Sequence, residues 1–283
     1  MNYDLYASIL VMHHEFRPTD AGVSLAVDFT APDLPVLREK YGLPAIAGEG
    51  CTFDRAVRMM DWLTTHVRHN GNCNPEGKRC ASTALDFAFD QPDKGVNCAW
   101  LATTLTECLL SLEIPARTVY IMPFAPYDCD NHVVTEVWTG DTWVMLDPTC
   151  NCFARDAEGT PLSVLGLRAA LASQKQITFN DGLRYNGQPY SHEEHRDYLA
   201  KDLCWLRMQE VSGQQDSRFV TLAPVGFDPH RHQLLNVQYR LRVQGDQPWL
   251  RDWLKRLESS GANEVFCAPA DAALPPREVN AHE

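Results

Sequence analysis

No apolar run in this sequence approaches the roughly 20 residues that a membrane-spanning helix needs. The opening residues, MNYDLYASILVMHHEF, also lack the basic start that precedes the apolar stretch of a signal peptide. We therefore expect no membrane span, no signal peptide and a cytoplasmic location. Basic side chains are fewer than acidic ones, 25 against 37, which gives a formal net charge of -12. Because nucleic-acid phosphates attract basic surfaces, this balance argues against a nucleic-acid partner.

The ten cysteines do not form the paired C-x-x-C pattern of a structural zinc site, and no H-E-x-x-H motif of a metalloprotease is present. The nearest approaches have other spacings: Cys73 with Cys80, Cys150 with Cys152, His66 with His69, and His192 with His195. We therefore expect no metal and no other cofactor. In a secreted chain of this size ten cysteines could form disulfide bridges, but without a signal peptide we expect reduced thiols.

What is present fits a globular protein with helices and strands. Of the 283 residues, 45% are hydrophobic and 22% are charged, which is an ordinary composition. Helical spacing of apolar residues predicts helices at 53–68, 98–112 and 248–258, and a capping box at Ser191 and Glu194 starts another that runs through Leu206. Strand-like patterns lie at 23–29, 116–122, 132–138, 142–147, 235–243 and 264–268. Together these elements predict an α+β fold.

Cys98 lies at the first turn of a predicted helix, directly after Asn97, which stands where an N-cap belongs. The free backbone N–H groups of a helix start carry partial positive charge. They favour a thiolate over a thiol, and they can also hold a developing oxyanion. Cys98 is therefore a candidate nucleophile, although a small buried hydrophobe is the commoner fate of a free cysteine.

The two strands on either side of a Thr-Gly-Asp turn predict a β-hairpin. If Trp138 opposes Asp141 across a tight turn, His132 falls directly opposite Asp147, with β-carbons roughly 4.5–5.5 Å apart. The imidazole could then donate one N–H to the carboxylate and keep its other nitrogen for a thiol. A register slip by one residue would break this arrangement. A surface hairpin with an incidental histidine and aspartate is the alternative.

Three stretches follow one another in the chain: GVNCAWLATTLTECLLSLEIPARTVYI, DNHVVTEVW and WVMLDPT. This text, within residues 55–150, resembles the transglutaminase-like superfamily of papain-like cysteine enzymes. In that family a cysteine stands at a helix start, a histidine opens H-x-x-x-E-V-W, and an aspartate lies in W-x-x-x-D-P-T. The resemblance implies that Cys98, His132 and Asp147 are the nucleophile, general base and orienting acid of a catalytic triad.

The nucleophile motif departs from the Gly-Gln-Cys-Trp of classical transglutaminases, since this chain reads Gly-Val-Asn-Cys-Ala-Trp. The change puts protein cross-linking and the second oxyanion donor in doubt, while the backbone N–H of Cys98 is the first donor. Asn97 and Trp100 are further oxyanion or cleft candidates, although Asn97 could serve only as a cap and Trp100 could only pack. Glu136 shares a strand face with His132 and could line the cleft, or it could be a solvated strand charge.

The resemblance implies a papain-like core in which an antiparallel sheet packs on the helix that bears the nucleophile. We expect residues 51–155 to form this transglutaminase-like catalytic core. Residues 1–50 would be a β-rich N-terminal addition. Residues 156–283 would be a C-terminal α/β elaboration, also with β-rich parts, that packs on the core.

The activity that the resemblance implies is acyl transfer through a thioester at Cys98, with an amide bond of a peptide, a protein or a small molecule as the substrate. Water is the expected acyl acceptor, which makes the protein a hydrolase of the peptidase or amidase type. An amine acceptor would instead make it an acyltransferase. A catalytically silent binding or structural module that kept the fold is the alternative from another class. The intact Cys, His and Asp in the expected order favour an enzyme.

Overall fold

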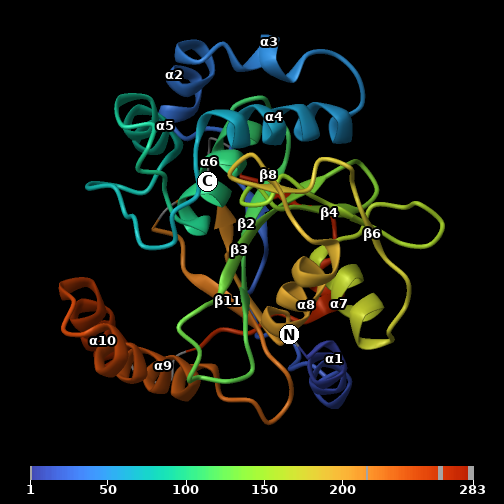
Figure 1. Ribbon diagram of the computed structural model, residues 1–283, viewed down its shortest axis with the longest axis vertical. Helices are drawn as coiled ribbons and strands as arrows, with labels where there is room; N and C mark the ends of the chain where they lie inside the picture. The colour runs from blue at the N-terminus through green and yellow to red at the C-terminus, as the bar shows by residue number, and fades with distance from the viewer. Residues whose placement is uncertain (1, 215, 261–263, 280–283) are drawn as a thin grey trace.

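The computed structural model describes residues 2–214, 216–260 and 264–279 and confirms an α+β fold (Figure 1). The helices are α1 (Tyr3–Met12), α2 (Asp33–Lys40), α3 (Leu43–Ala47), α4 (Thr52–His66), α5 (Ala81–Asp90), α6 (Cys98–Leu110), α7 (Val164–Ala172), α8 (His192–Asp202), α9 (Pro229–Gln244), α10 (Pro248–Ser260) and α11 (Pro269–Ala272). The strands are β1 (Ala26–Val27), β2 (Ala116–Met122), β3 (His132–Trp138), β4 (Trp143–Leu146), β5 (Ala154–Arg155), β6 (Thr178–Phe179), β7 (Arg184–Tyr185), β8 (Gln188–Pro189), β9 (Trp205–Gln209), β10 (Val211–Ser212), β11 (Phe219–Leu222) and β12 (Arg277–Glu278). Among these described residues, no helix has the length and apolar character needed to cross a bilayer.

A five-stranded antiparallel sheet forms the centre of the molecule, in the order β11-β9-β2-β3-β4. On one face α4, α5 and α6 build a core cluster with Val137 and Leu146. On the other face α1, α7 and α8 pack against Val134 and Met145 (Figure 1). Because both faces are covered, every residue of β3 except the last is buried. The antiparallel sheet packed on the helix that begins at Cys98 is therefore confirmed.

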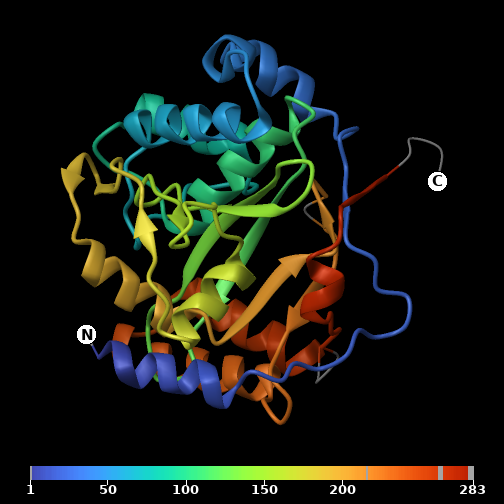
Figure 2. The same cartoon turned by 90° about the vertical axis from the view of Figure 1, so that its right-hand side faces the viewer.

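The N-terminal region is mainly helical, so a β-rich addition at residues 1–50 does not hold. The strand expected at 23–29 is reduced to β1, which lies between β10 and β12 in a parallel three-stranded sheet. Figure 2 shows this N-terminal segment running beside the C-terminal one. Both partner strands have only two residues, so the rest of the alternating segment has no strand to pair with. Pro32 and Pro35, which interrupt the strand pattern, stand at the N-cap and in the first turn of α2, where a missing N–H is tolerated.

Residues 235–243 belong to α9, so the prediction of a strand there is wrong. Val237 and Leu241 alternate with polar residues, but they also fit helical spacing and belong to the cluster between α9 and α10. The residues at the start of the element favour a helix over a strand. Asp228 caps the helix by accepting the backbone N–H of Arg231 at 2.9 Å, and a proline fills the first helical position.

The helices predicted to start near residues 53, 98, 191 and 248 correspond to α4, α6, α8 and α10. The third is shorter than expected, because α8 ends at Asp202 and the chain then enters β9. The strand predicted at 264–268 is reduced to a single bridge between Phe266 and Thr221. The domain boundaries after residues 50 and 155 stay predictions.

Candidate active site

α6 begins at Cys98, so the candidate nucleophile occupies the first position of the helix. The Asn97 side chain caps this helix by accepting the backbone N–H of Trp100 at 3.2 Å. The N–H groups of a first helical turn have no carbonyl partner within the helix and point toward a bound anion. Cys98 is half-buried and packs in a small cluster with Ala99 and Tyr120. The sulfur therefore stands at a positive helix end and is within reach of a substrate.

The loop before Cys98 is fixed by a short parallel pairing with the segment that follows α4. The carbonyl of Arg68 accepts the N–H of Val96 at 2.9 Å, and the carbonyl of Val96 accepts the N–H of Asn70 at 2.8 Å. Gly95 has a φ of +68°, and a Cβ there would meet the carbonyl oxygen of Arg68 at 2.7 Å. Only glycine fits this close approach, so the position of Cys98 depends on it.

β3 and β4 bring His132 and Asp147 together, but in a register that differs from the predicted one. Trp138 pairs with Trp143 and not with Asp141, because four residues and not two form the turn. Side chains alternate between the faces of a sheet, so a shift of two residues keeps His132 and Asp147 on a common face. Nε2 of His132 lies 2.8 Å from Oδ2 of Asp147, and both side chains are buried.

Electrostatics ties the three predicted residues together. Burial disfavours a charged His132, but the charge of Asp147, its hydrogen bond and a hydrogen bond with Cys98 raise the pKa of His132 well above its usual value. Burial also opposes a charged Asp147, but His132, His195 and the N–H of Thr149 lower the pKa of its carboxyl to about 2. Since Nε2 of His132 faces Asp147, its Nδ1 is left for the sulfur. Cys98, His132 and Asp147 thus form one connected chain, and their catalytic roles stay predictions.

The three further candidates, Asn97, Trp100 and Glu136, are not part of this chain of contacts. Asn97 acts as the helix cap, and Trp100 is buried in the core that α4, α5 and α6 form. The prediction that Glu136 lines the cleft is wrong, because its carboxylate accepts hydrogen bonds from the Arg117 guanidinium at 2.6 and 2.8 Å. It also accepts the backbone N–H of Val164 at 2.8 Å, so it joins β3 to α7 as a structural residue.

Sequence reasoning missed His195, which α8 places against Asp147. Its Nε2 lies 3.4 Å from Oδ2 of Asp147 and 3.1 Å from Sγ of Cys152. One turn further along α8, Tyr198 packs edge-on against His132, with ring centroids 5.3 Å apart. The H-x-x-H pair that contains His195 is visible in the sequence, but no sequence pattern connects this helix with the end of β4.

Cys152 and His195 repeat the residue types of the triad around the same carboxylate. Cys152, however, is completely buried, and burial raises the pKa of its thiol well above the usual value. A buried neutral thiol can neither reach a substrate nor attack it, whereas Cys98 is partly open. The geometry therefore favours Cys98 as the nucleophile of this cluster.

Asp147, Cys152 and His195 are also the residues that could hold a metal. Their ligand atoms lie within 4.8 Å of one another, and zinc accepts all three atom types. Oδ2 of Asp147, however, is already bonded to His132. In the part of the chain that the structure describes, Nδ1 of His195 has no hydrogen-bond partner, whereas a metal-bound imidazole usually donates that N–H. The donor set therefore fits a hydrogen-bonded cluster better than a zinc ion.

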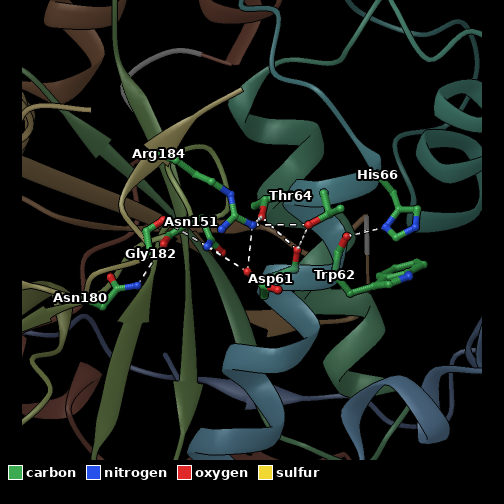
Figure 3. Close-up of polar contacts among 9 residues, drawn as sticks. Asp61, Trp62, Thr64, His66, Asn151, Asn180, Gly182 and Arg184 are labelled. Carbon is green, nitrogen blue, oxygen red and sulfur yellow. Dashed lines mark hydrogen bonds and ion pairs between the residues drawn. The ribbon is translucent and has the colours of Figure 1, made fainter. Parts of the chain in front are cut away.

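A polar network ties the loop after Asp147 to α4 (Figure 3). Asp61 of α4 accepts hydrogen bonds from the Asn151 amide at 3.2 Å and from the Arg184 guanidinium at 2.8 Å. The same Asn151 amide donates to the carbonyl of Gly182 at 3.2 Å. Two segments that flank the candidate site are thereby braced against one turn of α4.

The hairpin of β7 and β8, which contributes Arg184 to this network, also contacts the segment that follows α4. The hydroxyl of Tyr185 lies 2.9 Å from Nδ1 of His69. The Asn186 side chain accepts the backbone N–H of His69 at 2.7 Å and donates to its carbonyl at 3.0 Å. His69 in turn forms a parallel bridge with Val96, two residues before Cys98. The hairpin therefore supports the loop that leads to Cys98.

A comparison with protein families finds a match over part of the chain. Residues 41–148 match the model of the transglutaminase-like superfamily. The matched segment contains α3, α4, α5 and α6 and the strands β2, β3 and β4, with Cys98, His132 and Asp147. The resemblance predicted from the motifs is confirmed over this part of the chain.

A solved structure of a candidate cysteine protease from Cytophaga hutchinsonii is also similar to this chain. The alignment has 16% sequence identity and a TM-score of 0.33, and it covers 52% of this chain and 49% of that one. The chain thus spans about half the length of that protein. At this TM-score the likeness adds nothing to the argument from the family match. No curated protein matches the chain.

Proposed function

We propose that the protein is a cysteine-dependent acyl-transfer enzyme that hydrolyses an amide bond in a peptide, a protein or a small amide. One observation carries this proposal. Cys98, at the start of α6, contacts an imidazole that is hydrogen-bonded to a buried carboxylate at 2.8 Å. A nucleophile, a base and an orienting acid in one chain of contacts are the parts that thiol acyl transfer needs.

The reaction follows from these positions. His132 takes the thiol proton, and the sulfur of Cys98 attacks the carbonyl carbon of the substrate. The N–H groups at the start of α6 stabilise the resulting oxyanion. The His132 imidazolium then donates its proton to the leaving amine, the C–N bond breaks, and the acyl group stays on Cys98 as a thioester. His132 next deprotonates a water molecule, which attacks the thioester and releases the carboxylic acid and the thiol.

Two other functions are the alternatives to a hydrolase: an acyltransferase and a catalytically silent binding module. A primary amine in place of water would give a new amide and make the protein an acyltransferase. A silent binding module would have no use for the contact between Cys98 and the buried pair, which makes this reading the weaker one. Burying an imidazole and a carboxylate together reduces the free energy of unfolding unless both groups are hydrogen-bonded.

A cavity of about 180 Å³ lies between α6 and the central sheet. Thr103, Glu107 and Tyr120 are among the residues that line it, and Tyr120 also packs in the cluster that contains Cys98. This shared side chain supports a substrate that extends from the sulfur of Cys98 past Tyr120 into the cavity.

The first test compares two thiols of the same chain. Iodoacetamide at pH 7 should alkylate Cys98 roughly tenfold or more faster than Cys51, because His132 can take the proton of the Cys98 thiol. Cys51 is a matched control, since it is the N-cap of α4 and is more exposed but lacks the contact with His132. Mass spectrometry of the modified peptides gives both rates.

A second experiment measures catalysis directly, so that the test of the enzyme does not depend on alkylation alone. The Cys98→Ala variant should lose turnover of p-nitrophenyl acetate, and Cys51→Ala should keep it. Equal alkylation of Cys98 and Cys51, together with unchanged ester turnover in Cys98→Ala, would contradict the enzyme.

The acyl acceptor is tested with the same ester in the presence and absence of methylamine. Hydrolysis alone predicts acetate as the product and a rate that methylamine leaves unchanged. Formation of N-methylacetamide that requires Cys98 would replace the hydrolase by the acyltransferase.

A further inference from the structure

Asp147 faces a second imidazole besides that of His132. His195 is completely buried on α8, with its Nε2 3.4 Å from Oδ2 of Asp147. We propose that His195 is a neutral positioning residue, which donates its Nε2–H to Asp147 and fixes this carboxylate against His132. The inference rests on the proposed function, since it explains how the acid of the triad is held in place.

The charge state of His195 follows from its surroundings. Three aromatic rings pack around the imidazole: Phe179, Tyr190 and Tyr198, with centroids 5.1, 5.6 and 6.4 Å away. Burial is the largest influence and lowers the pKa of His195 to about 4. Asp147 acts in the opposite direction, while the imidazoles of His132 and His192 act in the same direction as burial. The ring is therefore neutral near pH 7 and carries one proton on one of its nitrogens.

The neighbours of Nε2 decide which nitrogen carries that proton. Nε2 lies between the carboxylate of Asp147 and the thiol of Cys152. A bare lone pair at Nε2 would face the negative charge of Asp147, whereas an N–H there is attracted to it. In the part of the chain that the structure describes, Nδ1 has no partner that would need its proton. The Nε2–H tautomer is therefore the one that this site favours.

Each oxygen of Asp147 is then held by a donor. Oδ1 accepts the backbone N–H of Thr149 at 2.9 Å, and Oδ2 accepts from His132 and His195. A carboxylate held in this way cannot rotate away from His132. Because His195 is neutral, it supplies the hydrogen bond without adding a positive charge that would compete with the His132 imidazolium.

The proposal is tested by NMR of protein with ¹⁵N-labelled histidine. Long-range ¹H–¹⁵N spectra at pH 7 should show His195 as a neutral ring protonated at Nε2, assigned by its absence from the spectrum of His195→Gln. A ring protonated at Nδ1, or one protonated at both nitrogens, overturns the proposal. This measurement on the wild-type protein needs no substrate, and a variant serves only to assign the signal.

Variants then test the effect on His132. His195→Phe fills the same space but removes the donor, so the charge of Asp147 is shared by fewer N–H groups. The pKa of His132 should rise by about half a unit to one unit, which corresponds to one hydrogen bond. His195→Gln places an amide N–H near the position of Nε2, so the pKa of His132 in this variant should equal that of the wild type. His192→Gln, on the same helix but exposed, is the matched control.

The outcomes separate this inference from the proposed function. An unchanged or lower pKa of His132 in His195→Phe contradicts the positioning role, even if Cys98 is alkylated fast in the wild type. Slow alkylation of Cys98 in the wild type contradicts the proposed enzyme, whatever the NMR spectra show. A loss of thermal stability in His195→Phe with no shift of the His132 pKa shows a purely structural residue and also overturns the inference.

Discussion

Asp147 shows how contacts can overcome burial at a single carboxyl group. Its side chain is completely buried, which by itself favours the neutral acid. His132, His195 and the N–H of Thr149 nevertheless lower its pKa to about 2. Asp147 is therefore ionised throughout the neutral range, and a His132 imidazolium always has a counter-charge beside it.

Replacing Asp147 by asparagine keeps the shape of the side chain and removes this charge. The pKa of His132 should then fall by roughly one to three units, because burial is no longer offset by an opposite charge. Asp141→Asn, in the turn of the same hairpin, should leave the pKa of His132 unchanged. NMR of ¹⁵N-labelled histidine measures this pKa in both variants. An identical pKa of His132 in the two variants would show that the charge of Asp147 does not act on the imidazole.

At the scale of residues, short motifs predicted that Cys98, His132 and Asp147 come together but missed the residues that support them. Cys98, His132 and Asp147 lie in stretches whose residue types and spacing reflect their local geometry. Glu136 lies in the same motif, but its orientation depends on Arg117, which pairs with it across the neighbouring strand. His195 comes from a helix that packs on the sheet only in the folded chain, so no local pattern could predict its contact with Asp147.

At the scale of elements, the loop before α6 rests on one glycine. Gly95→Ala introduces a Cβ that would meet the carbonyl oxygen of Arg68 at 2.7 Å, at a φ of +68°. We expect a loss in the free energy of unfolding of roughly 1–3 kcal/mol or more, measured by urea denaturation, and slower alkylation of Cys98 as α6 shifts.

A second glycine provides the control for this variant. Gly226 has a φ of +79°, but nothing lies within 4 Å of the position that its Cβ would take. Gly226→Ala should therefore show only the smaller effect of the backbone angle and leave Cys98 alkylation unchanged. If both variants lose the same stability, the close approach at Gly95 has no measurable effect.

Secondary structure could be predicted where one period fits and the ends are marked. α6 has an N-cap in Asn97, and Leu101, Leu105 and Leu109 are buried at four-residue steps. Residues 235–243 fit both a strand and a helix, and only the cap at Asp228 separates the two. The hairpin was predicted in a register two residues away, because pattern alone does not fix the length of its turn.

At the scale of the whole molecule, buried histidines make stability depend on pH. His232 lies between the rings of Trp205 and Phe227, and burial lowers its pKa to about 4. In the unfolded chain a histidine titrates near 6.5. The unfolded state therefore binds the proton first as the pH falls, and the stabilising contribution of the neutral ring is lost between about pH 6.5 and pH 4.

His232→Phe should reduce this dependence. Between pH 7 and pH 4.5 the wild type should lose roughly 1–3 kcal/mol more unfolding free energy than the variant, as measured by urea denaturation at both pH values. A change at the exposed His14 should leave the wild-type dependence intact. Parallel pH profiles for wild type and His232→Phe would show that the ring is not kept neutral in the fold.

The arrangement of distant segments was beyond prediction from the sequence. The stretch that resembles the family predicted β2, β3, β4 and α6. The positions of the N-terminal helices depend on the elements that they pack against, and the sequence did not predict these contacts. α1 packs against α7 and α8, and β1 pairs with segments near residues 211 and 277. Such contacts join segments that are far apart in the sequence, and the spacing of apolar residues within one segment does not predict them.

The small parallel sheet has a consequence for synthesis on the ribosome. β1 is made early, yet its two neighbours, β10 and β12, are made far later. At about 5–20 residues per second, residues 26 and 27 wait roughly ten seconds to one minute for the second of these strands. Until then Val27 has only part of its final cover, and a nascent chain that ends before residue 277 cannot close this sheet. The sheet therefore completes itself only once residues 277 and 278 have been made, after the candidate catalytic residues have left the ribosome.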